Sequence, residues 1–494
     1  MKNIFILFLL LIITVSCDLD DIEPQQSISL DAAFADETAI RFALNGMYDA
    51  YQDDDVGATF ITMSADLMAN RDMEFRGSFT SLQEIRSKTL VTSNVQVSAT
   101  WIDTYETINA ANAIIEAIEA NPDLEEGAAG AARGQSLAMR AYLHFELVRL
   151  YGETPFVPGS TVASNTQLGV PIILEATLSS DGITRPARNT VAEVYQRVLD
   201  DLAEAITLME ANGGGGQGQI DTEVAKSMLA RVYLQMGDYA NVLTVTDDII
   251  ATGGFSLVPD IADFFAEDGE FSSESIFEVS NLDDDGPPGQ TLTDFYSIDG
   301  RDDVIASEAY LALEAQLFND RLNQLFTDNN YTVMDHRYSE LLVASSNAND
   351  TDLRVNKYED AENEADNTPV FRYAEILLSN AEANVRENGR SQGALDLLNE
   401  VRNRSIRVED ELGLPVDNAA SYELADFTTD QEMIDAILLE RRVELAFEGY
   451  AFHDLTRLNS APEGFSFGEG RLAWPIPQRE RDVNGNLEQN PAYR

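Results

Sequence analysis

The stretch PVFRYAEILLSNAEANVRENGRSQGALDLLNEVRNRS, residues 369–405, predicts two helices joined by a short turn. Its first part places apolar residues three or four positions apart, which is the spacing of one helical face: Ala374, Leu377, Leu378, Ala381 and Val385. Asn388-Gly389 interrupts the pattern, and a second run with the same spacing follows as far as Arg402. Two such helices cannot bury their apolar faces alone. The rest of the chain must therefore supply neighbouring helices.

Helical periodicity returns in several other parts of the chain. We predict a helical scaffold from residues 36–52, 101–150, 190–252 and 370–458, with Asp36 placed to cap the first helix. The paired helices resemble the tetratricopeptide helix-turn-helix unit, although the spacing between pairs is irregular. We therefore expect residues 36–494 to form a single body.

Two long segments, residues 53–100 and 253–369, lack this helical period. The second contains Pro287-Pro288 and several acidic runs, with a short strand expected around Ser275–Val279. Long loops on a rigid body are where recognition groups tend to lie. We predict that both segments are loop regions that face the ligand.

The N-terminus has the pattern of an exported lipoprotein. Lys2 precedes an almost unbroken apolar run over residues 4–15, which is too short to span a bilayer. We therefore predict a signal peptide over residues 1–16. Cys17, the single cysteine of the chain, resembles a bacterial lipoprotein processing site and is expected to carry the lipid; a chance cysteine beside an ordinary cleavage point is the alternative. Residues 17–35 are polar and are predicted to form a tether.

The formal net charge of the chain is −54, from 86 acidic and 32 basic residues. A chain this acidic repels phosphate backbones, so we do not expect it to bind nucleic acid. No Gly-rich phosphate loop or nucleophile motif is visible, and we expect no cofactor.

No metal site is expected from the sequence either. The acidic clusters at residues 53–55 and 283–285 lack the alternating spacing of a calcium loop, and we interpret both as solvated loops. His144, His336 and His453 show no metal-ligand spacing and are interpreted as structural.

Several motifs, in order along the chain, resemble those of the SusD/RagB family of surface lipoproteins. They are Arg372-Tyr373-Ala374-Glu375-Ile376-Leu377-Leu378, Ala381-Glu382-Ala383, Leu398-Asn399-Glu400-Val401-Arg402, Glu440-Arg441-Arg442, Glu444-Leu445-Ala446-Phe447-Glu448-Gly449 and Trp474-Pro475-Ile476-Pro477. The resemblance covers nearly the whole chain and is firmest over residues 357–494.

This resemblance implies a mostly α fold, in which tetratricopeptide-like helix pairs form a right-handed superhelical scaffold with loop-rich insertions and a few short strands. It also implies a receptor without enzymatic activity, held on the outer membrane by its lipid and facing the exterior. Such a receptor binds oligosaccharide or polysaccharide and delivers it to a SusC-like TonB-dependent transporter.

Carboxylates and guanidinium groups occur together in these motifs. Glu375 and Glu382 lie two turns apart on one predicted helix, and Arg402, Arg441 and Arg442 offer partners. We predict a semi-buried ionic network that ties the helix pair to the last helix, and no catalytic role for these carboxylates.

Sugar recognition needs an aromatic face for the ring and planar polar groups for the hydroxyls. Trp101 lies on a helical stripe and Trp474 in the terminal motif, so we expect both in the core. By regional resemblance to the family, the candidate ligand contacts are Asn70, Arg71 and Asp72 of the early segment and Phe295 and Tyr296 of the insertion. Each of these is otherwise a packing or surface residue.

Three other functions stay open at this point. The lack of spare tryptophans leaves room for an oligopeptide receptor of the same architecture, as in RagB-like members. A surface glycoside hydrolase would need two carboxylates about 5 to 9 Å apart across a cleft, and acids are abundant here. A plain helical-repeat scaffold would leave the lipoprotein-like start unexplained.

Overall fold

A computed structural model describes residues 34, 36–121, 124, 126–179, 182–266, 271–282, 289–318, 320–328, 330–347 and 349–494. The predicted signal peptide, Cys17, nearly all of the tether and the acidic cluster at 283–285 lie outside the described residues.

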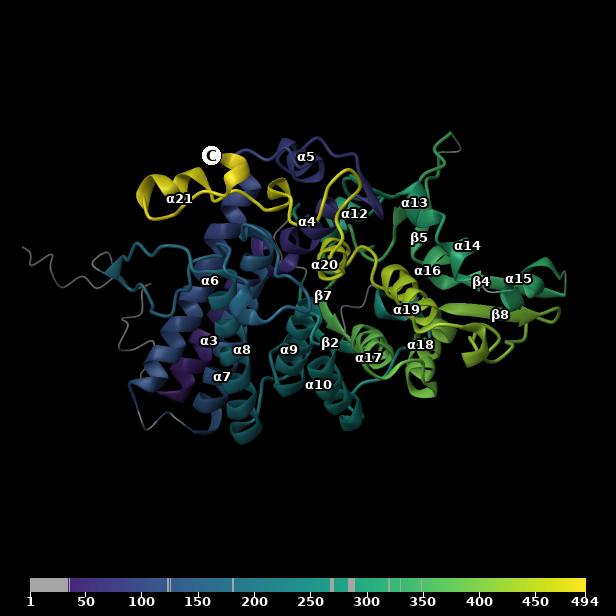
Figure 1. The fold of residues 1–494 in the computed structure, drawn as a ribbon, viewed down its shortest axis with the longest axis horizontal. Helices are drawn as coiled ribbons and strands as arrows, with labels where there is room; N and C mark the ends of the chain where they lie inside the picture. The colour runs from purple at the N-terminus through teal and green to yellow at the C-terminus, as the bar shows by residue number, and fades with distance from the viewer. Residues whose placement is uncertain are drawn as a thin grey trace, which may run out of the picture.

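Long helices standing side by side form the body of the protein, in a row that runs from α6 and α7 to α17 and α18 (Figure 1). They are α3 (Glu37–Gln52), α6 (Val95–Glu119), α7 (Gly127–Tyr151), α8 (Val191–Asn212), α9 (Thr222–Met236), α10 (Tyr239–Thr252), α17 (Tyr373–Asn388), α18 (Gln392–Ser405) and α19 (Asp430–Glu444). As predicted, Asp36 caps α3, where its side chain accepts a hydrogen bond from the Ala39 amide at 2.9 Å. The prediction of a mostly helical fold is confirmed.

Shorter helices connect and cover this row. They are η2 (a π-helical turn, Asp54–Ala58), α4 (Phe60–Ala69), α5 (Thr80–Ser87), η4 (Val162–Ser164), α11 (Ile261–Phe264), α12 (Leu292–Tyr296), α13 (Glu308–Leu311), α14 (Glu314–Leu317), α15 (Asp320–Thr327), α16 (His336–Ser339), η6 (Leu424–Asp426), α20 (Ala451–Arg457), η7 (Gly470–Leu472), α21 (Gln478–Val483) and η8 (Pro491–Tyr493).

The prediction of a loop over residues 53–100 is wrong, because much of this segment is helical. In α4 almost every side chain is buried, including the polar residues Ser64 and Asp66. A helix shows an apolar period only when one of its faces meets water. Since α4 is wrapped by the rest of the protein, its sequence carries no such period.

The strands form three small antiparallel sheets. One has the order β1 (Met73–Phe75), β3 (Val304–Ala306), β6 (Leu353–Val355) and β5 (Leu342–Ala344); the others pair β2 (Ser275–Val279) with β7 (Thr368–Arg372), and β4 (Tyr331–Asp335) with β8 (Ile406–Asp410). The predicted strand at Ser275–Val279 is present with the expected bounds.

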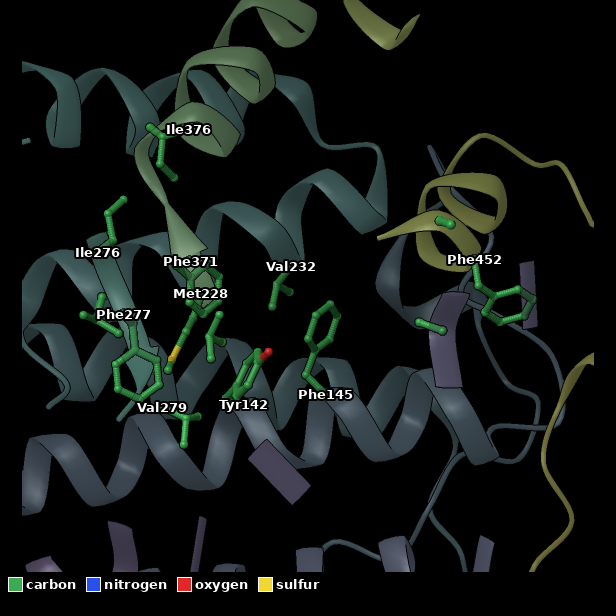
Figure 2. Packing of buried hydrophobic residues seen from close by; sticks show 14 of the residues in the cluster. Tyr142, Phe145, Met228, Val232, Ile276, Phe277, Val279, Phe371, Ile376 and Phe452 are labelled. Atoms are coloured by element: carbon green, nitrogen blue, oxygen red, sulfur yellow. The ribbon is translucent and has the colours of Figure 1, made fainter. Parts of the chain in front are cut away.

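The β2–β7 pair lies within the helical core. Figure 2 shows Phe277 of β2 and Phe371 of β7 beside Tyr142 of α7. The rings of Phe371 and Tyr142 have centroids 5.6 Å apart, and the guanidinium carbon of Arg231 on α9 lies 3.7 Å from the centre of the Phe371 ring. These contacts join the start of α17 to the helices before it. Trp101 and Trp474 are also in the core, as predicted.

A group of buried charges lies where β7, α18 and α19 meet, and we call it the buried ionic cluster. Arg372 is central: its guanidinium contacts Glu444 at 2.6 Å, Glu448 at 2.7 Å and Glu274 at 2.9 Å. The other members are Arg337, Lys357, Arg402, Arg404 and Glu440. Every member has less than 9% of its surface exposed, so water screens these charges little.

Burial alone would raise the pKa of Glu444, but the guanidinium groups of Arg404, Arg372 and Arg337 outweigh it and hold that pKa well below its usual range. Glu444 is therefore ionised at neutral pH and balances several buried cations.

The predicted ionic network is present in a different pairing. Arg441 lies 3.6 Å from Glu375 and so links α19 to α17, while Arg231 contacts Glu375 more closely, at 2.6 Å. The other predicted members have separate partners: Glu382 pairs with Arg457 and Arg386, Arg402 with Glu440, and Arg442 with Asp72.

Gly77 lies where the chain leaves β1 and passes close to the opposite strand. A Cβ atom at this position would lie 2.3 Å from Cζ of Phe75 and 2.6 Å from Cγ of Asp303. These separations are far below van der Waals contact, so only glycine fits without movement of its neighbours.

We expect Glu444→Gln to lower the free energy of unfolding by roughly 3 to 5 kcal/mol, because it leaves buried guanidinium groups without a counter-charge. Denaturant unfolding followed by circular dichroism measures the change. The exposed Glu411→Gln is the matched control and should have almost no effect. Equal stabilities of the two variants would contradict the role given to the buried ionic cluster.

We expect Gly77→Ala to cost roughly 1 to 3 kcal/mol of stability, because the added methyl group overpacks the space beside the Phe75 and Asp303 side chains. Gly46→Ala on α3 is the control: a Cβ there meets nothing within 4 Å, and alanine favours the helix by up to about 1 kcal/mol. Thermal unfolding of the two variants should show changes in Tm of opposite sign. A Gly77→Ala protein as stable as the wild type would contradict tight packing around Gly77.

Candidate functional site

The four-stranded sheet brings the two predicted ligand-facing segments together. β1 pairs with β3 so that Met73 lies opposite Ala306. Just beyond this pair, the Ser307 amide donates to the Asp72 carbonyl at 3.0 Å, and its hydroxyl donates to the Arg71 carbonyl at 2.6 Å. Residues 70–79 and 294–307 are therefore adjacent in the fold.

Two of the predicted ligand contacts in this region are in the core. Phe295 and Tyr296 end α12, and neither has any exposed surface. The Phe295 ring packs edge-on against Phe60 of α4, with centroids 5.5 Å apart, and Tyr296 packs against Tyr358 at 5.6 Å. Because a stacking platform must present a free ring face, this placement contradicts the prediction that they contact ligand.

The three predicted polar contacts have different environments. Asn70 is exposed and ends α4 in a left-handed conformation, with φ of 48°. Asp72 is buried and bridges two cations, Arg71 at 3.0 Å and Arg442 at 2.6 Å. Asp72 therefore holds the segment against α19 and is not available to a ligand, while Asn70 and Arg71 stay predictions.

An exposed aromatic ring that the sequence analysis did not select lies in the same region. Phe79 has 38% of its surface exposed, and the guanidinium carbon of Arg301 lies 4.1 Å from its ring centre. Behind it the Phe295 ring makes an edge contact, with centroids 6.0 Å apart. Phe79 stands alone between Ser78 and Thr80, and an isolated phenylalanine among small polar residues was the signal available in the sequence.

Two groups of paired charges lie on the segments near this ring. Arg301 pairs with Asp303 at 3.2 Å and with Asp294 at 3.4 Å, and Arg76 pairs with Asp352 at 2.6 Å. We call Phe79 and these five charged residues the Phe79 surface. Burial raises the pKa of the Asp294 carboxyl, with Arg301 acting in the opposite direction.

The Phe79 surface offers an aromatic ring together with planar guanidinium and carboxylate groups. These are the groups that contact the apolar face and the hydroxyls of a sugar. Both carboxylates nearest the ring are paired with the same guanidinium group, Arg301. The arrangement is thus suited to binding.

A hollow of about 890 Å³ lies between α6, residues 171–177 and 183–186, and α21. Trp101 and Tyr105 contribute to its lining, but Trp101 is only 4% exposed and the Tyr105 hydroxyl donates to the Pro171 carbonyl at 2.8 Å. The aromatic rings of this hollow are therefore less accessible than the Phe79 ring.

The three histidines have structural contacts. His144 is buried, with its ring bonded to the Arg140 carbonyl and the Ile173 amide, and His336 pairs with Asp260 at 2.8 Å. His453 is buried beside Phe452.

No helix among the described residues has both the length and the apolar character needed to cross a membrane.

Comparison with known proteins gives two family matches. A model described as "SusD family" matches residues 212–468, and one described as "Starch-binding associating with outer membrane" matches residues 19–234. A "SusD-like protein" of Formosa agariphila is 26% identical, in an alignment that covers 100% of this chain and 99% of the relative.

Solved structures show the same fold. A putative sugar binding protein from Bacteroides vulgatus has a TM-score of 0.73 and 26% identity over 92% of this chain and 98% of its own. A SusD superfamily protein from Bacteroides thetaiotaomicron has a TM-score of 0.75 and 24% identity over 92% of this chain and 99% of its own. Together with the match of the family model to more than half of the sequence, these findings show that the chain belongs to the SusD family.

Proposed function

We propose that this protein is a cell-surface lipoprotein that binds an oligosaccharide or polysaccharide at the Phe79 surface and passes it to a SusC-like TonB-dependent transporter. The observation that carries the proposal is the exposed Phe79 ring with Arg301 beside it, at the meeting point of two segments distant in sequence. Membership of the SusD family supports it, as does the likeness to the putative sugar binding protein from Bacteroides vulgatus.

The chemistry of the Phe79 surface fits a polymeric ligand. A sugar ring packs its C–H face on the exposed phenyl group, while Arg301 and Arg76 donate to hydroxyls and the paired aspartates accept from them. The surface is open, so it can engage an internal segment of a long chain as readily as an end. An open site also releases its ligand readily, which suits transfer to a second protein.

The membrane attachment in this proposal rests on Cys17 and its diacylglycerol. The family description that mentions the outer membrane supports it. The lipid would hold the protein at the same membrane that contains the transporter, so the two partners would meet in one plane.

An oligopeptide receptor is the second candidate function. It is favoured by one observation: Trp101 and Trp474, the two tryptophans of the chain, are both buried and leave no tryptophan face for stacking. The charged pairs of the Phe79 surface would in that case bind the termini and amides of a peptide.

We expect Phe79→Ala to weaken binding of the preferred polysaccharide about tenfold or more, because it removes the ring face, worth roughly 1.4 kcal/mol. The preferred ligand is first identified by affinity electrophoresis of the purified protein against a panel of polysaccharides, and affinity is then measured by calorimetry. Phe42→Ala is the matched control, since Phe42 is also an exposed phenylalanine with an arginine, Arg41, beside its ring.

The same experiment separates the alternatives. Equal affinities of Phe79→Ala and Phe42→Ala would place the sugar elsewhere, with the hollow beside α21 as the next site to test. Binding of peptide mixtures but of no polysaccharide would establish the oligopeptide receptor. New reducing ends in the bound polymer would show a glycoside hydrolase and contradict a receptor without enzymatic activity.

A further inference from the structure

Three consecutive aspartates lie at the junction between α3 and α4. Asp53 follows α3, and Asp54 and Asp55 begin the π-helical turn η2. One carboxylate oxygen from each of the three lies within 4.8 Å of the others. The chain thus gathers three carboxyl groups in a tight turn, a position where α-helical hydrogen bonding is interrupted.

The size of this triplet fits a single calcium ion. Calcium binds carboxylate oxygens at about 2.3 to 2.6 Å, so oxygens on opposite sides of one ion are about 5 Å apart. The separations in the triplet are within that limit. A small movement of the side chains would bring the three carboxylate oxygens to the distances of one shared ion.

A second observation points to a ligand. Asp54 has only 8% of its surface exposed, and its Oδ2 atom has no hydrogen-bond partner in the part of the chain that the structure describes. A buried carboxylate oxygen without a partner is costly, and natural proteins usually satisfy such an atom. This burial also corrects the interpretation of residues 53–55 as a solvated loop.

A fourth carboxylate, Asp103 of α6, faces the triplet. Its charge acts on Asp54 and Asp55 and raises the pKa of both, while Arg479 of α21 lowers the pKa of Asp103 itself. Burial, aided by repulsion from the neighbouring carboxylates, raises the pKa of Asp55 to about 8 and that of Asp54 to about 6. Asp55 accepts a hydrogen bond from the Gln96 side chain, and Asp53 accepts one from the Asp55 amide at 3.0 Å.

We propose that Asp53, Asp54 and Asp55, with Asp103 alongside, bind one calcium ion. The ion neutralises the carboxylates and ties the α3–α4 junction to α6. The ion also stabilises the start of α4, which leads through Asn70 into β1 and then to Phe79. The proposal stands independently of sugar binding.

The test uses the purified protein after treatment with EDTA, titrated with calcium chloride by calorimetry. A background of about 0.15 M sodium chloride, with magnesium present in excess, suppresses weak binding to the acidic surface. We expect one calcium site per chain and a rise in Tm of at least about 2 °C at saturating calcium. Magnesium alone should give a much smaller rise.

Three variants make the test specific to the triplet. Asp54→Asn and Asp53→Asn should each weaken calcium binding about tenfold or more, because each removes a ligand charge. Asp53→Asn is the safer variant for folding, since an amide oxygen can still accept the 3.0 Å bond from the Asp55 amide. Asp49→Asn removes an exposed charge from neighbouring α3 and should leave calcium affinity within about twofold of wild type.

Two results would overturn the proposal. One is a calcium affinity that is the same in Asp53→Asn as in Asp49→Asn. The other is a rise in Tm that magnesium reproduces in full, which would mean general screening of the acidic surface and no calcium site.

Discussion

The contact between Arg372 and Glu444 is the interaction on which most of the structure depends. Arg372 ends β7 and directly precedes α17, and Glu444 ends α19. A guanidinium group without exposed surface is tolerated only when carboxylates surround it, because the cost of removing it from water is several kcal/mol. Each charge in the buried ionic cluster therefore requires all of its partners to be in place.

This requirement joins the insertion to the helical scaffold. Glu274, Arg337 and Lys357 belong to residues 253–369, and each contacts a charge on α19 or its end, or on the β7–α17 junction. Lys357 follows β6, which pairs with β3 in the sheet that carries the Phe79 surface. The site is thus held by a sheet that is itself anchored through buried charge, and the Asp72–Arg442 pair adds a second attachment to α19.

The sequence predicted helices best where one face of the helix is buried and the other is exposed to water. The helices α3, α8 and α18 each bury one face, and their periods predicted them well. Helix α4, in which almost every side chain is buried, gave no period and was missed. Of the arginines that contact Glu375 and Glu382, Arg441 was predicted, but Arg231 and Arg457 were not, because the sequence does not show which distant residues pack beside α17.

The candidate site was only partly predictable for the same reason. The two segments that form it were identified, yet the choice between Phe295 and Phe79 depends on which ring α4 covers. Phe60 of α4 packs against Phe295 and leaves Phe79 outside. Which ring is exposed therefore depends on the packing of α4, a helix that the sequence pattern did not predict. The aspartate triplet was visible in the sequence, but the burial of Asp54 was not.

Hydrogen exchange of the native protein in increasing denaturant, followed by mass spectrometry, tests most directly whether the insertion and the scaffold form one cooperative unit. The account predicts that peptides covering β3 and peptides covering α17 exchange through the same global opening, with the same free energy and the same dependence on denaturant. Exchange of β3 through a separate opening of lower free energy, while α17 stays protected, would contradict it.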